Sequence, residues 1–304
     1  MITSLSILIP VYNDLAAPLV EALWKQAEAV EGLEYEIVVA DDGSFDPLIV
    51  KMNMETCRKL GCRYVKWKHH VCRAAMRNDL ARLGRYDWRL MVDTRVRPVR
   101  DDFIRRYLES GAREGEVVIG GVEVDGGAAS RRLYRRNLRF RYEKHEQPKH
   151  SAAKRAERPY ASFRATNFFH HRSVLERVPY DEDILTYGYE DVMLGKALRE
   201  AGIRVAHIDN PVAYMSFECN RDYIYKVNES MYTLALLAPK LRGYSPLLAA
   251  YDRLRRFGVV TLLSYWHELF GPAERWLLCR MPSLTLLKMY KLGLFVSLVE
   301  KVRK

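Results

Sequence analysis

The stretch Glu36–Ser44 reads EIVVADDGS, in which a short apolar run is followed at once by two aspartates, a glycine and a serine. Such an unbroken apolar run is typical of a strand that is buried on both faces. Residues 5–11 (LSILIPV) form a second run of this kind, which ends at Tyr12-Asn13. Strands buried on both faces need cover on both sides, so the two runs predict a parallel sheet between layers of helices.

The segments around these runs alternate between helical and strand patterns. Residues 15–30 have helical spacing, and Asp46-Pro47 is typical of an N-cap and first residue of a helix that ends at Gly61. We expect further strands over 62–67, 88–93, 116–124 and 204–209, and further helices over 73–84 and 101–111. This order predicts an α/β fold with a mostly parallel sheet flanked by helices.

The later part of the chain has a different organisation. Residues 127–160 are rich in Arg, Lys and His and lack long apolar periodicity, so we expect an excursion from the sheet. From Asn220 the patterns are helical, and we expect three prolines, Pro246, Pro272 and Pro282, to break the later helices. We therefore predict a main domain over residues 1–218 and a C-terminal helical region over 219–304.

Composition limits the class of protein. The chain has 304 residues, 49% of them hydrophobic, which is enough for a sizeable core. Five cysteines show no metal-ligand spacing and are typical of a reducing compartment. The first residues do not resemble a signal peptide, and no apolar run is long enough to span a bilayer. We expect a cytoplasmic protein.

The net charge of +11 is concentrated in two regions, residues 131–158 and residues 239–304. The second region mixes Arg and Lys with large apolar side chains at helical spacing. That pattern fits helices that lie on an anionic membrane surface, and it fits equally well helices packed on the main domain with a solvated basic face. An RNA-binding module would explain the charge but not the acids described next, so we expect no nucleic acid partner.

Acidic side chains follow the predicted strands at the points where the strands end. Asp41 and Asp42 come directly after the second strand, and Asp93 ends the fourth. Acids are poor core formers, and the carboxyl ends of parallel strands meet at one edge, where open α/β sheets bind ligands. One such acid could be a helix cap. Three aspartates on one edge of the sheet indicate a ligand-binding site.

A second acidic feature is Tyr187-Gly188-Tyr189-Glu190-Asp191, followed by a helical pattern that ends at Gly202. Both acids would lie in the first turn of this helix, where the helix dipole favours negative charge. We expect the dipole to lower the carboxylate pKa and keep the group ionised. By themselves, Glu190 and Asp191 could also be ordinary helix N-terminal acids.

Together these features resemble family 2 glycosyltransferases of the GT-A (Rossmann-like) fold. The resemblance covers roughly residues 4–226. Within the family, the pattern between Asn137 and Lys226 is most similar to bacterial transferases of surface-glycan assembly. The matching segments, in order, are Ser6–Asn13, Glu36–Ser44, Arg73–Asn78, the strand end at Asp93, and Tyr187–Asp191.

The resemblance implies an inverting transfer from a nucleotide-sugar donor, UDP-sugar favoured, to a glycan or lipid-linked acceptor. Asp191 would be the general base, and Glu190 would orient the acceptor. Because that acceptor is membrane-borne, it favours peripheral contact at the inner face of the membrane. The residues implied to bind the nucleotide-sugar are Pro10, Tyr12, Asn13, Asp41, Asp42, Arg77, Asn78, Asp93 and Arg95.

Two departures from the family pattern concern a divalent cation. The family usually has Asp-x-Asp after the fourth strand, where this chain has Met91-Val92-Asp93-Thr94-Arg95. Either Met91 replaces the first aspartate or Arg95 replaces the second, and we favour the former. Tyr214 stands where relatives often have a metal-binding histidine. We expect Asp93 to be the metal ligand, with uncertain dependence on Mn²⁺ or Mg²⁺, and Arg95 to replace part of the cation's charge.

The histidines predict no metal site of their own. His207 fits a sheet-face histidine, and adjacent residues of a strand, as in His69-His70 and His170-His171, point to opposite faces. Two rival functions remain. A nucleotidyltransferase would need a glycine-rich loop that the chain lacks after its first strand. A non-catalytic family member that binds nucleotide or glycan remains an alternative because of Met91 and Tyr214.

Overall fold

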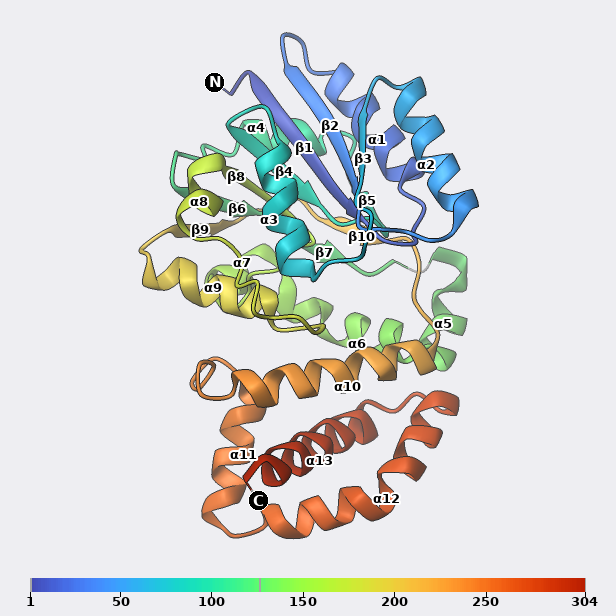
Figure 1. Ribbon diagram of the computed structural model, residues 1–304, viewed down its shortest axis with the longest axis vertical. Helices are drawn as coiled ribbons and strands as arrows, with labels where there is room; N and C mark the ends of the chain where they lie inside the picture. The colour runs from blue at the N-terminus through green and yellow to red at the C-terminus, as the bar shows by residue number, and fades with distance from the viewer. Residues whose placement is uncertain (1, 126, 304) are drawn as a thin grey trace. The chain divides into compact units, whose positions relative to one another are not determined.

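The computed structural model describes residues 2–125 and 127–303, which divide into two compact units (Figure 1). The first unit contains the described residues up to Glu123 together with Gln147–Leu185 and Glu190–Ser216. The second contains Val124–Glu146, Thr186–Tyr189 and the described residues from Phe217 onward.

The first unit is built on a seven-stranded sheet with the order β3-β2-β1-β4-β8-β6-β9. Its strands are β1 (Ser4–Val11), β2 (Glu34–Asp41), β3 (Arg63–Lys66), β4 (Trp88–Val92), β6 (Glu116–Ile119), β8 (Asn167–His171) and β9 (Arg204–His207). All neighbours pair in parallel except β8, which runs antiparallel to both β4 and β6. The predicted mostly parallel α/β sheet is confirmed. Strand β8 was not in the expected strand order, although the pair His170-His171 was treated as part of a strand.

Helices cover both faces of this sheet. On one face, α1, α2 and α4 pack over Leu5, Ile7 and Ile9; on the other, α3, α8 and α9 pack over Leu8 and Met91. The predicted cap of α2 is present, because Asp46 accepts hydrogen bonds from two backbone N–H groups and Pro47 follows it. The helical segments of this unit are α1 (Ala17–Glu28), α2 (Pro47–Lys59), α3 (Arg73–Leu83), α4 (Phe103–Leu108), η2 (Gln147–His150), α7 (Ala152–Ala156), α8 (Arg172–Arg177) and α9 (Glu190–Glu200).

A three-stranded sheet lies beside the large one, formed by β5 (Val96–Pro98), β10 (Val212–Tyr214) and β7 (Val122–Glu123). The expected continuous strand over 116–124 is wrong, because the chain breaks at Gly120-Gly121 and changes sheets. A Cβ at Gly120 would lie 2.1 Å from the Asn210 carbonyl oxygen, and Gly121 has a φ of +93°. The close approach of the Asn210 carbonyl at Gly120 and the positive φ at Gly121 both exclude a regular strand at this point.

The second unit is helical. It contains η1 (Gly127–Ala129), α5 (Ser130–Arg136), α6 (Leu138–Glu146), α10 (Asn220–Leu237), α11 (Pro246–Arg256), α12 (Val260–Arg280) and α13 (Leu284–Arg303). The predicted break at Pro272 is wrong, because α12 continues through it. A proline inside a helix costs about 3 kcal/mol, and α12 accommodates Pro272 at an exposed position while Leu278 is buried. Among the described residues, no helix combines the length and apolar character that crossing a bilayer requires.

Candidate active site

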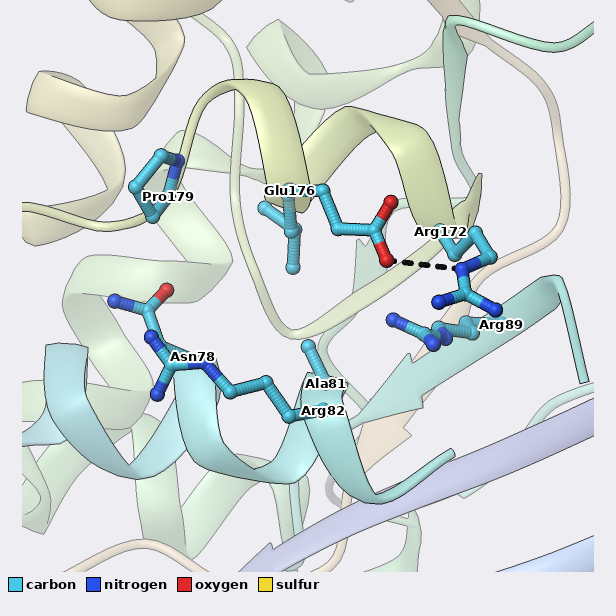
Figure 2. A pocket seen from close by; sticks show the side chains of 8 residues that line it. Asn78, Ala81, Arg82, Arg89, Arg172, Glu176 and Pro179 are labelled. Atoms are coloured by element: carbon cyan, nitrogen blue, oxygen red, sulfur yellow. Dashed lines mark hydrogen bonds and ion pairs between the residues drawn. The ribbon is translucent and has the colours of Figure 1, made fainter. Parts of the chain in front are cut away.

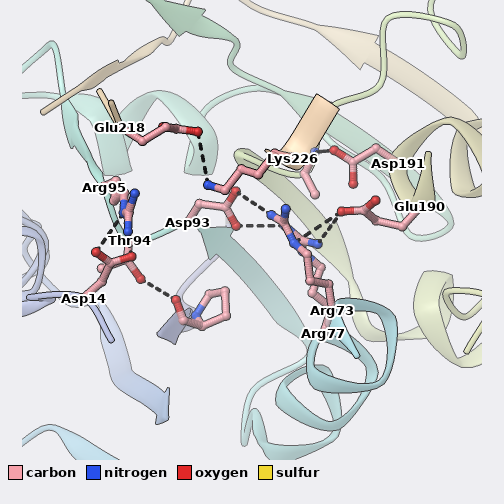
Figure 3. A network of polar contacts seen from close by, with 12 residues as sticks. Asp14, Arg73, Arg77, Asp93, Thr94, Arg95, Glu190, Asp191, Glu218 and Lys226 are labelled. Carbon is pink, nitrogen blue, oxygen red and sulfur yellow. Dashed lines mark hydrogen bonds and ion pairs between the residues drawn. The ribbon is translucent and has the colours of Figure 1, made fainter. Parts of the chain in front are cut away.

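Four charged side chains from three elements of the first unit meet at the C-terminal end of β4. Asp93 follows the strand, Arg73 and Arg77 belong to α3, and Glu190 begins α9 (Figure 3). Arg77 donates a 3.0 Å hydrogen bond to Asp93 and lies 3.7 Å from Glu190. Arg73 lies 3.3 Å from Glu190 and 3.9 Å from Asp93. Two guanidinium groups are therefore shared between two carboxylates.

Arg77 is the buried centre of this cluster, with a side chain only 3% exposed. Burial alone lowers the pKa of a cation, but the neighbouring acids, Asp93 first among them, leave the Arg77 pKa raised. Its Nε and one Nη are buried and donate no hydrogen bond to any described residue. The guanidinium thus keeps N–H donors that suit an incoming phosphate oxygen.

Asp191 lies in the first turn of α9, as predicted. Its Oδ2 accepts a 3.0 Å hydrogen bond from the backbone N–H of Ala165, whereas its Oδ1 is buried with no partner among the described residues (Figure 3). Burial raises the pKa of this carboxyl to about 6 against the attraction of Arg77, and Glu190 adds to the rise. The expected lowering is wrong, because the loss of water around the carboxylate outweighs the helix N-terminus.

The first two strand ends form a separate cluster of predicted site residues. The backbone N–H of Asn13 donates to Ser44 Oγ at 2.8 Å, and Asn13 Oδ1 accepts from the backbone N–H of Phe45 at 3.0 Å. Asp41 is fully buried and accepts hydrogen bonds from Tyr64 and from the backbone of Ser44. The loops after β1 and β2 are therefore held to one another by their polar side chains.

Asp42 and Tyr12 meet at His70, which was not predicted to belong to the site. His70 Nδ1 lies 2.8 Å from Asp42 Oδ2, and the imidazole stacks on the Tyr12 ring with 4.2 Å between centroids. Burial raises the pKa of Asp42, while a hydrogen bond from Val71 and the charge of His70 oppose the rise. The His69-His70 pair was considered only as a metal ligand, so this contact was missed.

Three predicted residues have other contacts. Asn78 donates to the Tyr180 carbonyl at 3.0 Å and to Glu182 at 2.7 Å, and it accepts from the Tyr180 N–H at 2.9 Å. Arg95 Nε donates to both carboxylate oxygens of Asp14, at 2.7 Å to Oδ1 and 2.6 Å to Oδ2. Pro10 contributes its carbonyl oxygen, which accepts a hydrogen bond from the Thr94 hydroxyl.

Asn78 also lines a pocket of about 350 Å³ between α3 and α8 (Figure 2). The other polar residues drawn there include Arg82, Arg172 and Glu176. Arg82 is paired with Asp79 at 2.7 Å, and Arg172 is paired with Glu176 at 2.9 Å. Arg89 also lines this pocket; it is buried and donates to the backbone carbonyls of Tyr86 and Gly84.

Among the described residues, no group of three His, Cys, Asp or Glu side chains is placed to hold a metal by protein ligands alone. Asp93 is already paired with Arg73 and Arg77, and Met91 is fully buried in the core. His207 contacts Arg155 and the Pro159 carbonyl instead, which agrees with the sheet-face interpretation.

The comparison with family models gives one match, to glycosyl transferase family 2, over residues 6–178. The chain belongs to this family. That match includes the strand ends at Tyr12, Asp42 and Asp93 together with Arg77, and it ends before Glu190. The protein is therefore a family 2 glycosyltransferase, and the roles of the two acids of α9 rest on their geometry. No curated protein matches the chain.

Solved structures show the same GT-A fold. The mannosyltransferase PcManGT of Pyrobaculum calidifontis, in complex with GDP-Man and Mn²⁺, is 15% identical with a TM-score of 0.57, and the match covers 98% of this chain and 86% of that one. S. aureus TarS, residues 1–349, is 13% identical with a TM-score of 0.52, covering 99% and 91%. The same TarS fragment with UDP-GlcNAc is 14% identical with a TM-score of 0.51, at the same coverage.

Proposed function

We propose that this family 2 glycosyltransferase moves a sugar from a nucleoside-diphosphate sugar to an acceptor hydroxyl with inversion at the anomeric carbon, and that Asp191 is the general base. The observation that carries the proposal is the free oxygen of Asp191. It is buried, has no partner among the described residues, and belongs to a carboxyl whose pKa of about 6 lies close to the working pH of a cytoplasmic enzyme.

The proposed reaction is a single in-line displacement. The acceptor oxygen attacks the anomeric carbon, Asp191 Oδ1 takes the hydroxyl proton, and the bond to the diphosphate oxygen breaks on the opposite side. The nucleoside diphosphate leaves with additional negative charge. The N–H donors of the buried Arg77 and of the partly exposed Arg73 stabilise that charge. Glu190 orients the acceptor and holds both guanidinium groups in place.

The donor is proposed to be a UDP-sugar. Its base would stack at Tyr12, and Asp41 or Asp42 would accept a uracil N–H. Asn13, Pro10 and Asn78 complete the proposed binding region, with the supporting contacts described above. Structures of similar fold hold GDP-Man and UDP-GlcNAc. Either nucleotide therefore belongs in a screen.

The acceptor is proposed to be a glycan or lipid-linked molecule in surface polysaccharide assembly, reached from the cytoplasm at the inner face of the membrane. The support is the basic tail and the pattern of residues 137–226. We propose that the division at residue 218 separates the transferase domain, with its excursion over 127–160, from helices that meet this acceptor.

A divalent cation is proposed to be of secondary importance. The PcManGT structure, which has a similar fold, contains Mn²⁺, and a cation would supply charge to the leaving diphosphate. In this chain Asp93 is the proposed metal ligand, yet two guanidinium groups already take up its charge. The proposed reaction therefore relies on Arg73 and Arg77, with Arg95 as a further source of positive charge.

A screen of nucleotide-sugars for release of nucleoside diphosphate tests the function. The full chain is mixed with each donor and with extracts of lipid-linked glycans, and released UDP or GDP is measured. We expect one donor to be consumed and Asp191→Asn to stop its consumption. Tight binding of a donor with no turnover under any acceptor would instead favour the non-catalytic alternative.

A further inference from the structure

An exposed apolar stripe runs along α12 in the second unit. Leu262, Tyr265, Trp266, Leu269 and Trp276 follow one another at steps of three, one, three and seven residues, which places them on one helix face. Their exposed fractions lie between 47% and 72%. We call this set the α12 stripe. Large side chains that remain in water over four helical turns indicate a missing partner surface.

The opposite face of α12 makes the stripe more unusual. Helices of soluble proteins bury apolar residues and expose polar ones. Here the buried face includes His267 and Glu274, which lie 3.6 Å apart, together with Gly271 and Leu278. Gly293 of α13 lies against the His267 ring. Trp266 reaches this face, because its Nε1 donates to Glu274 Oε1 at 3.3 Å, while the other members of the α12 stripe stay exposed.

Basic residues stand at both ends of the α12 stripe. Arg253, Arg255 and Arg256 end α11 and are exposed, and the exposed Phe257 follows them. At the other end, the exposed Arg280 lies over the Trp276 ring with 4.2 Å to its centroid. This arrangement decides between two possible partners, which are a second copy of the chain and a lipid surface.

A symmetric pair of stripes would place cations against cations. In a parallel pair, the Arg253–Arg256 end of one stripe lies against the same end of the other, and Arg280 lies against Arg280. In an antiparallel pair, the Arg253–Arg256 end lies against Arg280, so basic residues face basic residues in both cases. Like charges in contact oppose association. An anionic lipid surface neutralises both ends at once. Trp and Tyr also favour the boundary between lipid headgroups and hydrocarbon, where one part of the ring is wet.

We propose that the α12 stripe is a membrane-binding surface, on which α12 lies in the interfacial layer of an anionic bilayer while the neighbouring arginines contact lipid phosphates. Aromatic residues on one face and arginines at the ends are the features of an interfacial helix. The proposal concerns the second unit alone. It would hold even if the protein proved to bind a donor without transferring sugar.

Vesicle binding of the full chain tests the proposal. Vesicles of phosphatidylcholine with phosphatidylglycerol are compared with vesicles of phosphatidylcholine alone, by co-sedimentation at low and high salt. We expect binding to the anionic vesicles, weakened by salt because exposed charges are screened. We also expect a blue shift of tryptophan emission. Binding that is absent at low salt overturns the proposal.

Matched variants locate the surface. Leu269→Glu should weaken vesicle binding about tenfold or more, because it removes an exposed leucine that would enter the bilayer and adds a negative charge. Leu236→Glu, an exposed leucine on α10 of the same unit, should leave binding unchanged. The triple change of Arg253, Arg255 and Arg256 to Gln should remove most of the salt dependence. Thermal unfolding of each variant confirms that the fold is intact.

Two outcomes exclude the proposal even if vesicles are bound. Equal losses with Leu269→Glu and Leu236→Glu would show that general acidity, and not the α12 stripe, governs binding. A wild-type dimer in sedimentation equilibrium that Leu269→Glu converts to monomer, without any change in vesicle binding, would assign the stripe to a second copy of the chain.

Discussion

The backbone N–H of Ala165 holds Asp191 by one carboxylate oxygen at 3.0 Å, and no described group donates to the other. A helix-capping acid has its oxygens bound to N–H groups of its own helix. Asp191 instead accepts its hydrogen bond from Ala165, which is distant in sequence. This hydrogen bond fixes the orientation of the carboxylate. The oxygen that remains is the one available to take a proton.

Replacing Asp191 by Asn is therefore expected to remove turnover and spare donor binding. Loss of a general base costs about 10²–10⁴-fold in rate, and Asn can still accept the Ala165 N–H. The measurements are kcat for sugar transfer and nucleotide affinity by calorimetry. Glu200→Gln, a change at the far end of α9, is the control and should alter neither. Wild-type turnover in Asp191→Asn would contradict the assignment.

The same variant is expected to be at least as stable as the wild type at pH 7.5. The native pKa of about 6 lies above the ordinary value of 3.8, so the folded state binds the proton more readily than the unfolded one. Stability from this group is therefore present at low pH and lost as pH rises through about 6, with a cost of about 3 kcal/mol above it. Denaturant unfolding measures the difference. Strong destabilisation by Asp191→Asn would favour an ordinary helix-terminal acid.

The pH dependence of kcat/KM follows from the same carboxyl. A base must be deprotonated to act, so activity should fall tenfold per pH unit below about 6 and level off above it. Without the raised pKa the fall would begin near pH 4. A profile measured from pH 4.5 to 8.5 distinguishes the two. An inflection near 4 would show that Asp191 is not the group that limits the rate.

Much of the fold could be predicted from the sequence because its signals are local. The buried runs at Leu5 and Ile37, the cap at Asp46 and the acids that open α9 each depend on a few neighbouring residues. Strand β8 was left out of the expected strand order, although its pair His170-His171 was treated as strand residues. Its two phenylalanines lie next to two histidines, and fully buried histidines are uncommon.

The electrostatics of the site could not be predicted in the same way. The pKa of Asp191 depends mainly on its burial. The residues next to Asp191 in the sequence do not predict how deeply its carboxyl group is buried. Arg73 lies one helical turn before Arg77 and could have been noted on that spacing. The pairing of Arg95 with Asp14 joins residues 81 positions apart, so only the folded structure reveals it.

Gly43 offers a test of the loop that follows β2. Its φ is +74°, and a Cβ there would lie 2.7 Å from the His70 backbone nitrogen. Gly43→Ala is expected to lower the free energy of unfolding by at least about 2 kcal/mol and to weaken donor binding, because strain and overlap add. Gly61→Ala is the matched control, with a φ of +68° and nothing within 4 Å. It should cost only about 1 kcal/mol and leave donor affinity unchanged. Equal effects of the two changes would show that the contact with the His70 backbone is unimportant.

The last prediction concerns the charge that stabilises the leaving diphosphate. Arg73 and Arg77 flank Asp93, and Arg95 is held by Asp14. If guanidinium groups provide most of the stabilisation of the leaving diphosphate, removal of metal ions with EDTA should leave substantial activity. Arg73→Ala should lower kcat about 10²-fold, the scale of removing one group that stabilises developing charge. Arg95→Ala should lower kcat more than it lowers nucleotide affinity. The loss of kcat should be smaller than with Arg73→Ala, because Arg95 must first exchange Asp14 for phosphate.

Arg105→Ala, an arginine on α4, is the control for general loss of positive charge and should have no effect. Measurements of kcat and nucleotide affinity with EDTA, Mg²⁺ and Mn²⁺ decide the matter. The prediction is contradicted if EDTA abolishes activity, trace Mn²⁺ restores it, and neither Arg73→Ala nor Arg95→Ala changes it. A cation, and not these arginines, would then stabilise the leaving diphosphate.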